Sequence, residues 1–185
     1  VGGLPTDSPI VDVAAGRLHS MALTEDGRVY AWGSNGGGQL GDGTLVERHA
    51  PTLVTSTLTS GATPVDAGAL PTVKAITAGN SSFAITDDGD AYGWGPNADG
   101  ALGIGVSGFT HVSTGFRRVR PVKMITVSDA ADVLDVATGG GHTLVLTSAG
   151  TVYATGDGYN GQLGNGTSGV NARTASPVAL TFPSL

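Results

Sequence analysis

The sequence predicts an all-β fold of three β-propeller blades, each made of four antiparallel strands. One pattern is repeated at residues 10–44, 73–105 and 133–167, and its period is typical of stacked or radially arranged units. Within each copy, short β-rich runs alternate with Gly-rich turns, and no long segment has apolar residues at helical spacing. Four short strands per copy indicate a propeller blade. We therefore treat residues 1–185 as a single three-repeat propeller segment.

Each copy is expected to begin with two strands joined closely in sequence. The first strands are predicted at Ile10–Ala14, Val73–Thr77 and Val133–Ala137. The second strands, at 20–24, 82–86 and 143–147, end at the turns Asp26-Gly27, Asp88-Gly89 and Ala149-Gly150. Asp-Gly between two β-rich runs is a strong hairpin signal, because Gly supplies the positive φ that such turns require.

The return strand and the Gly-rich turn after it carry the most regular positions of the repeat. The aromatic residues in register are Tyr30, Tyr92 and Tyr153, with Trp32 and Trp94 two residues further on in the first two copies. The glycines that follow are Gly33, Gly95 and Gly156. A fourth strand is expected to start at Pro51, Pro121 or Pro177, because Pro is tolerated at the first residue of a strand. We expect all these repeat positions to be structural.

The pattern VAAG, two residues, HS, ALT, DG, VYAWG, N, GQLG resembles the regulator-of-chromosome-condensation repeat. The match is strongest at Val13 to Gly41 and strong in the third copy, whereas the second copy has Ser near the usual His and Ala101-Leu102 for Gln-Leu. Members of this family form seven-bladed propellers. Their known functions include nucleotide exchange on a nuclear-transport GTPase, with chromatin binding, and β-lactamase inhibition by a secreted bacterial propeller. The resemblance therefore implies binding rather than a shared chemistry.

Charge and composition argue against several classes of partner. The net charge of −6 and the scarcity of Lys remove the electrostatic driving force for nucleic-acid binding. No apolar stretch approaches the roughly 18 residues of a membrane helix, and the chain has no Cys for disulfides or thiolate metal sites. A composition rich in Ala, Gly, Val and Thr suggests a bacterial or phage protein, and favours exposure outside the cell or on a virion over the cytoplasm. We expect a protein partner.

The residues that could carry chemistry do not form a convincing catalytic or metal site. His19 and His142 occupy equivalent repeat positions, so we expect each imidazole to bridge backbone groups between strands. His49 and His111 lie outside the repeat pattern and have no partner at metal-ligand spacing. No convergent nucleophile, base and acid are recognisable. We expect no enzymatic activity, no metal and no cofactor.

The segments that break the repeat are the better candidates for binding. Residues 105–120 contain two aromatic residues, a His and three Arg, and aromatic and Arg side chains on loops are typical of interface hot spots. The residues are Phe109, His111, Phe116, Arg117, Arg118 and Arg120. Core packing of both Phe and a solvated basic loop are the alternatives. Tyr159, in a turn where the other copies have small residues, is a further candidate.

Three blades are too few to close a propeller, since the usual number is four to eight. Within the chain, the next repeat glycine follows the strand proline at two spacings, Pro51 to Gly79 and Pro121 to Gly139. The residues after Pro177 and those before Gly16 together have a length between these two spacings. One hypothesis is therefore that two chains form a six-bladed homodimer. Others are that the chain is a segment of a longer propeller, or a structural subunit of a larger bacterial or phage assembly. A nucleotide exchange factor and a carbohydrate-active enzyme are the less favoured functions.

Overall fold

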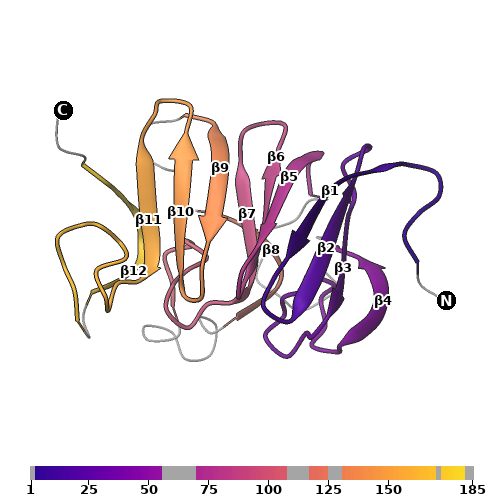
Figure 1. Cartoon of the computed structure of the whole chain (residues 1–185), viewed down its shortest axis with the longest axis horizontal. Coiled ribbons are helices and arrows are strands. Elements are labelled where there is room, and N and C mark those ends of the chain that lie inside the picture. The colour runs from indigo at the N-terminus through magenta and orange to yellow at the C-terminus, as the bar shows by residue number, and fades with distance from the viewer. Residues whose placement is uncertain (1–2, 56–69, 108–116, 125–130, 170–171, 182–185) are drawn as a thin grey trace.

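The computed structural model describes residues 3–55, 70–107, 117–124, 131–169 and 172–181. The described residues form three four-stranded antiparallel sheets and no helix, which confirms the predicted all-β fold of propeller blades. Each sheet contains strands that are consecutive in the sequence, in the order in which they occur. Blade 2 lies between blades 1 and 3, which form the two ends of the array (Figure 1).

The strands of each blade follow the repeat. Blade 1 contains β1 (Ile10–Ala15), β2 (His19–Thr24), β3 (Val29–Gly33) and β4 (Arg48–Leu53). Blade 2 contains β5 (Val73–Ala78), β6 (Ser82–Thr86), β7 (Ala91–Pro96) and β8 (Arg117–Lys123). Blade 3 contains β9 (Val133–Thr138), β10 (His142–Thr147), β11 (Val152–Asp157) and β12 (Arg173–Ala179).

The fourth strand of each blade starts earlier than predicted, so the expectation that Pro51, Pro121 and Pro177 open these strands was wrong. Each Pro lies inside an edge strand, within the stretch where the ladder with the third strand shifts register. In blade 1 the shift falls between the pairs Ala31–Thr52 and Gly33–Arg48. A Pro lacks an N–H, and an edge strand with a bulge tolerates this loss.

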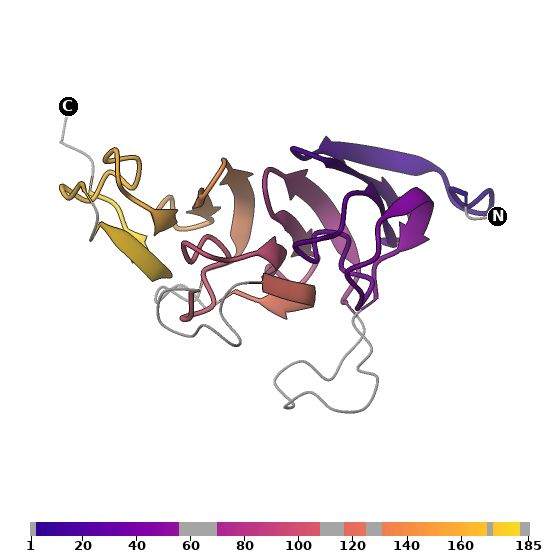
Figure 2. The ribbon, with the colours of Figure 1, turned by 90° about the horizontal axis from the view of Figure 1, so that it is seen from below.

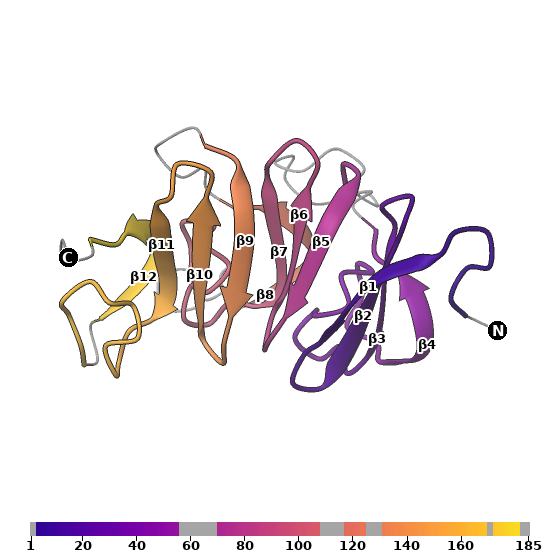
Figure 3. The same ribbon diagram turned by 45° about the horizontal axis from the view of Figure 1, so that its top comes forward.

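Two apolar cores lie between neighbouring blades rather than within a blade. The first core joins Met21 and Leu23 of blade 1 to Val73, Ile76 and the indole of Trp94 in blade 2. The second core joins blade 2 to blade 3 in the same way, around Phe83 and Val136. The succession of sheets along the long axis is visible from below and from a tilted direction (Figures 2 and 3). The facing sides of neighbouring sheets therefore cover one another.

Backbone hydrogen bonds repeat the same connection at both interfaces. Arg17 N donates to Gly79 O at 2.8 Å between blades 1 and 2, and Asn80 N donates to Gly139 O at 3.4 Å between blades 2 and 3. At the opposite ends of the strands, Val73 N donates to Gly27 O at 3.4 Å. The equivalent bond is that of Val133 N to Gly89 O, at 2.8 Å. The blades are thus joined by one repeated geometry.

The repeated glycines after the third strands explain why the motif needs Gly at this position. The φ angles of Gly33, Gly95 and Gly156 are 109°, 101° and 104°, in a region that L side chains rarely adopt. A Cβ on Gly33 would also lie 2.6 Å from the carbonyl oxygen of Leu18. The glycine therefore allows the turn between β1 and β2 to approach the end of β3.

Replacing Phe83 by Ala tests whether stability depends on packing between blades. Phe83 is fully buried in the core between blades 2 and 3. We expect the variant to lose about 3–5 kcal/mol in free energy of unfolding, because a cavity replaces the ring. The measurement is urea denaturation, with Leu134→Ala on an exposed position of β9 as the control. The control should change by less than about 0.5 kcal/mol, and an equal loss in both variants would contradict the prediction.

Candidate functional site

The junction between blades 1 and 2 contains a chain of buried hydrogen bonds. The Nε2 of His19 lies 2.7 Å from the Oγ of Ser82, and this Oγ lies 2.7 Å from the carbonyl oxygen of Gln39. The indole Nε1 of Trp94 donates to the same carbonyl at 3.0 Å. Because a carbonyl oxygen only accepts, Ser82 gives its proton to Gln39 and accepts a hydrogen bond from the Nε2–H of His19. This assigns the tautomer of the imidazole.

The contact between His19 and Ser82 has the spacing of a base and a nucleophile, but its surroundings give it a structural role. Ser82 and Trp94 are fully buried, so no substrate reaches the hydroxyl. The hydroxyl proton is already engaged with a backbone carbonyl rather than with the imidazole. Burial also lowers the pKa of His19 from 6.5 to about 4, so the imidazole is neutral near pH 7. The chain of hydrogen bonds therefore joins two blades.

The equivalent positions in the other blades differ from this arrangement. His142 is partly buried, and Ser81 replaces the His in blade 2, where its hydroxyl donates to Pro96 O at 2.6 Å. Thr155 stands where blades 1 and 2 have Trp, and its hydroxyl lies 3.0 Å from both Gly100 O of blade 2 and Thr174 O of blade 3, either of which can accept its proton. Tyr153 is buried in the second core, whereas Tyr30, Tyr92 and Trp32 are partly buried.

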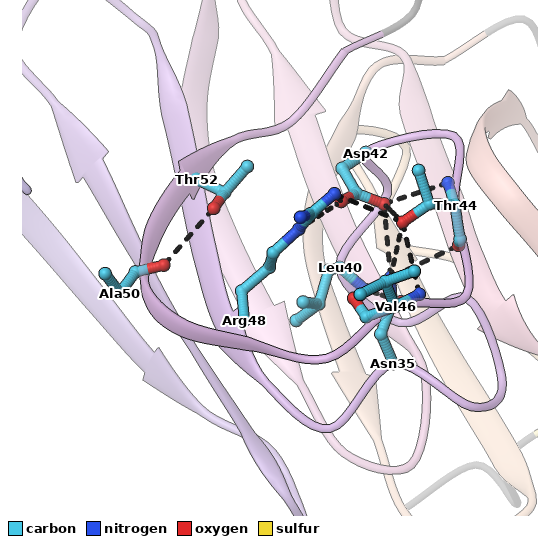
Figure 4. Close-up of polar contacts among 8 residues, drawn as sticks. All are labelled: Asn35, Leu40, Asp42, Thr44, Val46, Arg48, Ala50 and Thr52. Atoms are coloured by element: carbon cyan, nitrogen blue, oxygen red, sulfur yellow. Dashed lines mark hydrogen bonds and ion pairs between the residues drawn. The ribbon is translucent and has the colours of Figure 1, made fainter. Parts of the chain in front are cut away.

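The loop between β3 and β4 is held by the side chain of Asn35 (Figure 4). The Nδ2 of Asn35 donates to Asp42 Oδ1 at 3.1 Å and to the carbonyl oxygens of Thr44 and Val46 at 3.2 and 3.1 Å. The Oδ1 of Asn35 accepts a hydrogen bond from Leu40 N at 3.0 Å. One buried amide therefore contacts four residues of the loop.

Asp42 extends this network to the edge strand. Its Oδ2 accepts a hydrogen bond from the Nε of Arg48 at 2.9 Å, and its Oδ1 accepts hydrogen bonds from the N and Oγ1 of Thr44. Burial opposes the ionisation of Asp42, but the hydrogen bonds from Thr44, Arg48 and Asn35 outweigh it and hold the pKa of the carboxyl below its usual value. The loop is therefore built around an ionised carboxylate.

Blade 2 repeats the same support with Asn97, and this residue type was not singled out from the sequence. The Nδ2 of Asn97 donates to Val106 O at 2.7 Å, and its Oδ1 accepts from Leu102 N at 3.0 Å. The Asn of the repeat motif, followed five residues later by Leu, is the signal that could have identified it. Blade 3 has Gly158 at this place.

The candidate binding residues do not form one cluster in the described structure. Arg117 is exposed and Arg118 is partly buried, both on the outer strand β8. The guanidinium of Arg120 packs against Gly43 of blade 1, because a Cβ on Gly43 would lie 2.3 Å from its Nη2. Tyr159 is exposed in the loop between β11 and β12. Phe109, His111 and Phe116 lie outside the described residues.

One end of the sheets, which we call the loop end, carries four of the exposed large apolar side chains of the described residues. It consists of the turns that join the first two strands of each blade and the loops that join the last two. The exposed side chains on it are Leu18, Leu45, Val46 and Tyr159. Sequence reasoning missed all but Tyr159, because Leu18, Leu45 and Val46 are ordinary aliphatic residues until the fold places them on the surface.

Metal binding and membrane insertion are two further properties that side-chain clusters and helices could support. No group of three or more His, Cys, Asp or Glu side chains in the described ranges could hold a metal ion. In the same ranges, no helix is long and apolar enough to cross a membrane.

The low pKa of His19 predicts a pH dependence of stability. Unfolded His binds its proton near pH 6.5 and folded His19 near pH 4, so the unfolded chain binds more protons between these values. The contribution of the neutral, buried His19 to the free energy of unfolding is complete above the unfolded pKa of 6.5. It decreases as the pH falls toward 4. Between pH 7 and pH 5 it should fall by about 2 kcal/mol.

Urea denaturation of His19→Gln and His49→Gln at these two pH values isolates this contribution. The side chain of His49 is largely exposed. The pH-dependent loss should shrink by about 2 kcal/mol in His19→Gln and remain unchanged in His49→Gln. The same loss in the His19 variant as in the parent protein would rule out a neutral, buried His19.

Removing the Asn35 amide should destabilise the loop between β3 and β4. The variant Asn35→Ala leaves buried backbone groups, including Leu40 N, without their partner, and we expect a cost of about 2 kcal/mol. Asn160→Ala, in the exposed turn of blade 3, is the control and should change stability by less than about 0.5 kcal/mol. Thermal denaturation compares the two, and equal melting temperatures would show that the network contributes nothing.

Comparison with known proteins agrees with this architecture. Two family models for the regulator of chromosome condensation (RCC1) repeat match the chain, one at residues 10–39 and 133–162, the other at 26–84 and 88–146. The chain is 33% identical over 161 residues to the human probable E3 ubiquitin-protein ligase HERC4, covering 86% of this chain and 13% of HERC4. It is 35% identical over 161 residues to protein pim1 of Schizosaccharomyces pombe, covering 84% of this chain and 28% of pim1.

Solved structures show the same fold over almost the whole chain. Human WBSCR16 superimposes with a TM-score of 0.72 at 27% identity, covering 95% of this chain and 38% of WBSCR16. Prp20p from Saccharomyces cerevisiae, described with its binding properties to Gsp1p and histones, gives a TM-score of 0.69 at 25% identity and covers 94% of this chain and 38% of Prp20p. The chain thus spans well under half of each relative. It belongs to the regulator of chromosome condensation (RCC1) repeat family.

Proposed function

We propose that the chain is a non-enzymatic protein-binding module that presents its loop end to a protein partner. The observation that carries this proposal is the exposure of Leu18, Leu45, Val46 and Tyr159 at the same end of the sheets. Exposed apolar and aromatic side chains on a rigid scaffold are the usual material of interface hot spots. The similarity to Prp20p, which binds Gsp1p and histones, supports a partner that is itself a protein.

The blade 1 part of the loop end is suited to this role because side-chain hydrogen bonds hold its backbone. In blade 1, Asn35 and Asp42 hold the loop that carries Leu45 and Val46. A preorganised loop loses little conformational entropy on binding, so more of the contact energy remains as affinity. The repeat supplies the scaffold, and the side chains that differ between the blades supply the specificity.

Self-association is a second proposal, and the observation that favours it is the exposure of apolar side chains on the outer faces of blades 1 and 3. Val13 of β1 and Leu146 of β10 are exposed, whereas equivalent residues at the two internal interfaces are buried. Two copies joined through these faces would complete a six-bladed ring. A role as a structural subunit of a larger assembly uses the same faces.

The variant Leu18→Ser/Val46→Ser tests the loop-end proposal. Partners are captured from an extract of the organism that encodes the chain, identified by mass spectrometry, and purified for isothermal titration calorimetry. We expect the double variant to bind the partner at least 30-fold more weakly, which corresponds to the loss of one hot spot of about 2 kcal/mol.

The matched control is Leu134→Ser, which also removes an exposed aliphatic side chain but lies on β9, away from the loop end. It should bind with the affinity of the parent protein. A partner that binds the double variant and the parent equally well would contradict the proposal, provided that circular dichroism shows both to be folded.

A further inference from the structure

We infer that Asn35 is a deamidation site controlled by the fold, and that the reaction makes opening of the loop between β3 and β4 irreversible. The next residue is Gly36, and the chain has the same Asn-Gly pair at Asn160 and Asn165. Because Gly has no Cβ, its backbone nitrogen approaches the preceding side chain with little steric hindrance. Three pairs of one chemistry in different surroundings separate the effect of the fold from intrinsic reactivity.

The reaction consumes only water. Hydroxide takes the proton from the backbone nitrogen of Gly36, and this nitrogen attacks Cγ of Asn35, so that a bond from N to Cγ forms. The bond from Cγ to Nδ2 breaks, and the leaving nitrogen takes a proton from water and departs as ammonia, which regenerates the hydroxide. A cyclic imide remains. Water then adds to either carbonyl of the imide and opens the ring to isoaspartate or Asp.

The closed loop blocks this reaction through the side chain of Asn35, which is only 1% exposed. Its Nδ2 donates hydrogen bonds while its Oδ1 accepts one from Leu40 N at 3.0 Å. Attack makes the flat amide carbon tetrahedral, so these hydrogen bonds cannot all persist. Gly36 is exposed, and a Cβ on it would have no neighbour within 4 Å. Protection therefore comes from the buried amide rather than from the attacking residue.

The product cannot rebuild the loop, because an ionised carboxylate has no hydrogen to donate. The oxygens that Nδ2 contacts act as acceptors: Asp42 Oδ1 at 3.1 Å and the carbonyls of Thr44 and Val46 at 3.2 and 3.1 Å. Deamidation would place a second carboxylate beside that of Asp42 (Figure 4). Unmatched acceptors and repulsion between like charges both oppose closure. In isoaspartate, the main chain also runs through Cβ, which lengthens the loop.

The loop that would stay open contributes both to the junction of blades 1 and 2 and to the loop end. Gly43 N donates to Val119 O of blade 2 at 2.9 Å. The same loop carries the exposed side chains of Leu45 and Val46. Deamidation would therefore break a contact between blades and displace part of the proposed binding surface. The effect on binding rests on the proposed function, whereas the deamidation itself does not.

Peptide mapping by mass spectrometry, during incubation at slightly alkaline pH, tests the inference on the folded chain and on the chain in urea. Trypsin cleaves after Arg28 and Arg48 and isolates Asn35 on one peptide. In urea, all three Asn-Gly pairs should react at similar rates and give isoaspartate. In the folded chain, Asn35 should react at least about 100-fold more slowly than in urea, because only the open loop reacts. The exposed Asn165 should slow by less than about tenfold.

The variant Asp42→Ala tests whether the hydrogen-bond network controls opening. It removes an acceptor of Nδ2 without changing the reacting pair, so deamidation of Asn35 in the folded chain should accelerate about fivefold, the factor for one hydrogen bond. The rate in urea should not change. The matched control is Asp99→Ala in blade 2, which also removes a carboxylate paired with an Arg. This control should leave the rate at Asn35 unchanged.

The variant Asn35→Asp tests whether the product can close the loop. Amide hydrogen exchange should show that Gly43 N loses its protection, because the loop no longer docks on Val119. The control Asn160→Asp makes the same change in an exposed turn and should keep Gly43 N protected.

Four results would overturn the inference. Equal rates at Asn35 in the folded and unfolded chain would show that the loop does not control the reaction, and no reaction in urea would show that Asn35 is not a deamidation site. An unchanged rate in Asp42→Ala would exclude control by the network. Protection of Gly43 N in Asn35→Asp would show that the product closes the loop.

Partner binding by Asn35→Asp is measured separately by calorimetry. Unchanged affinity in a variant that has lost protection at Gly43 N would count against binding through the loop end. The deamidation inference would stand in that case, so the failure of one proposal does not imply the failure of the other.

Discussion

The structure depends on one interaction, which is the packing of the apolar face of each four-stranded sheet against a neighbouring sheet. Neither core of this chain belongs to a single blade, since both are shared between consecutive blades. Burial of such surface contributes about 25 cal/mol per Å², so an isolated blade would lose most of its stabilisation. The hydrogen bonds from His19 through Ser82 to Gln39 then fix how the covered faces align. Apolar burial and these hydrogen bonds together therefore set the arrangement of blades 1 and 2.

Residues at one repeat position differ in exposure according to the place of their blade in the array. Val13, Ile76 and Val136 are encoded by one repeat position, yet the first is exposed and the others are buried. Likewise, Trp94 is sealed between two blades while Trp32 is only partly covered. A repeat sequence thus specifies an interface at each of its boundaries, including the outer ones. The two proposals therefore concern different surfaces, the outer faces for self-association and the loop end for a different protein.

Much of the fold could be predicted from the sequence, because it follows from local signals. The Asp-Gly turns, the β-rich runs and the regular Tyr and Gly positions predict blades of four strands, and the structure has them. The position of Pro51 could not be predicted, since a shift in the β3–β4 ladder, rather than the start of a strand, accommodates it. The packing of Arg120 against Gly43 of the neighbouring blade could not be predicted either. The same holds for the hydrogen-bond network around Asn35. Such features depend on contacts between segments that are distant in the sequence.

Amide hydrogen exchange, resolved by strand and followed from dilute to concentrated protein, tests most directly whether contact between blades holds the structure together. The account predicts that β6 of blade 2 exchanges slowest in dilute solution, because both faces of its sheet are covered. Strands β1 and β10 should exchange faster in dilute solution and become protected as the concentration rises. Equal protection of all three blades in dilute solution, unchanged on concentration, would contradict the claim that each sheet depends on its neighbours.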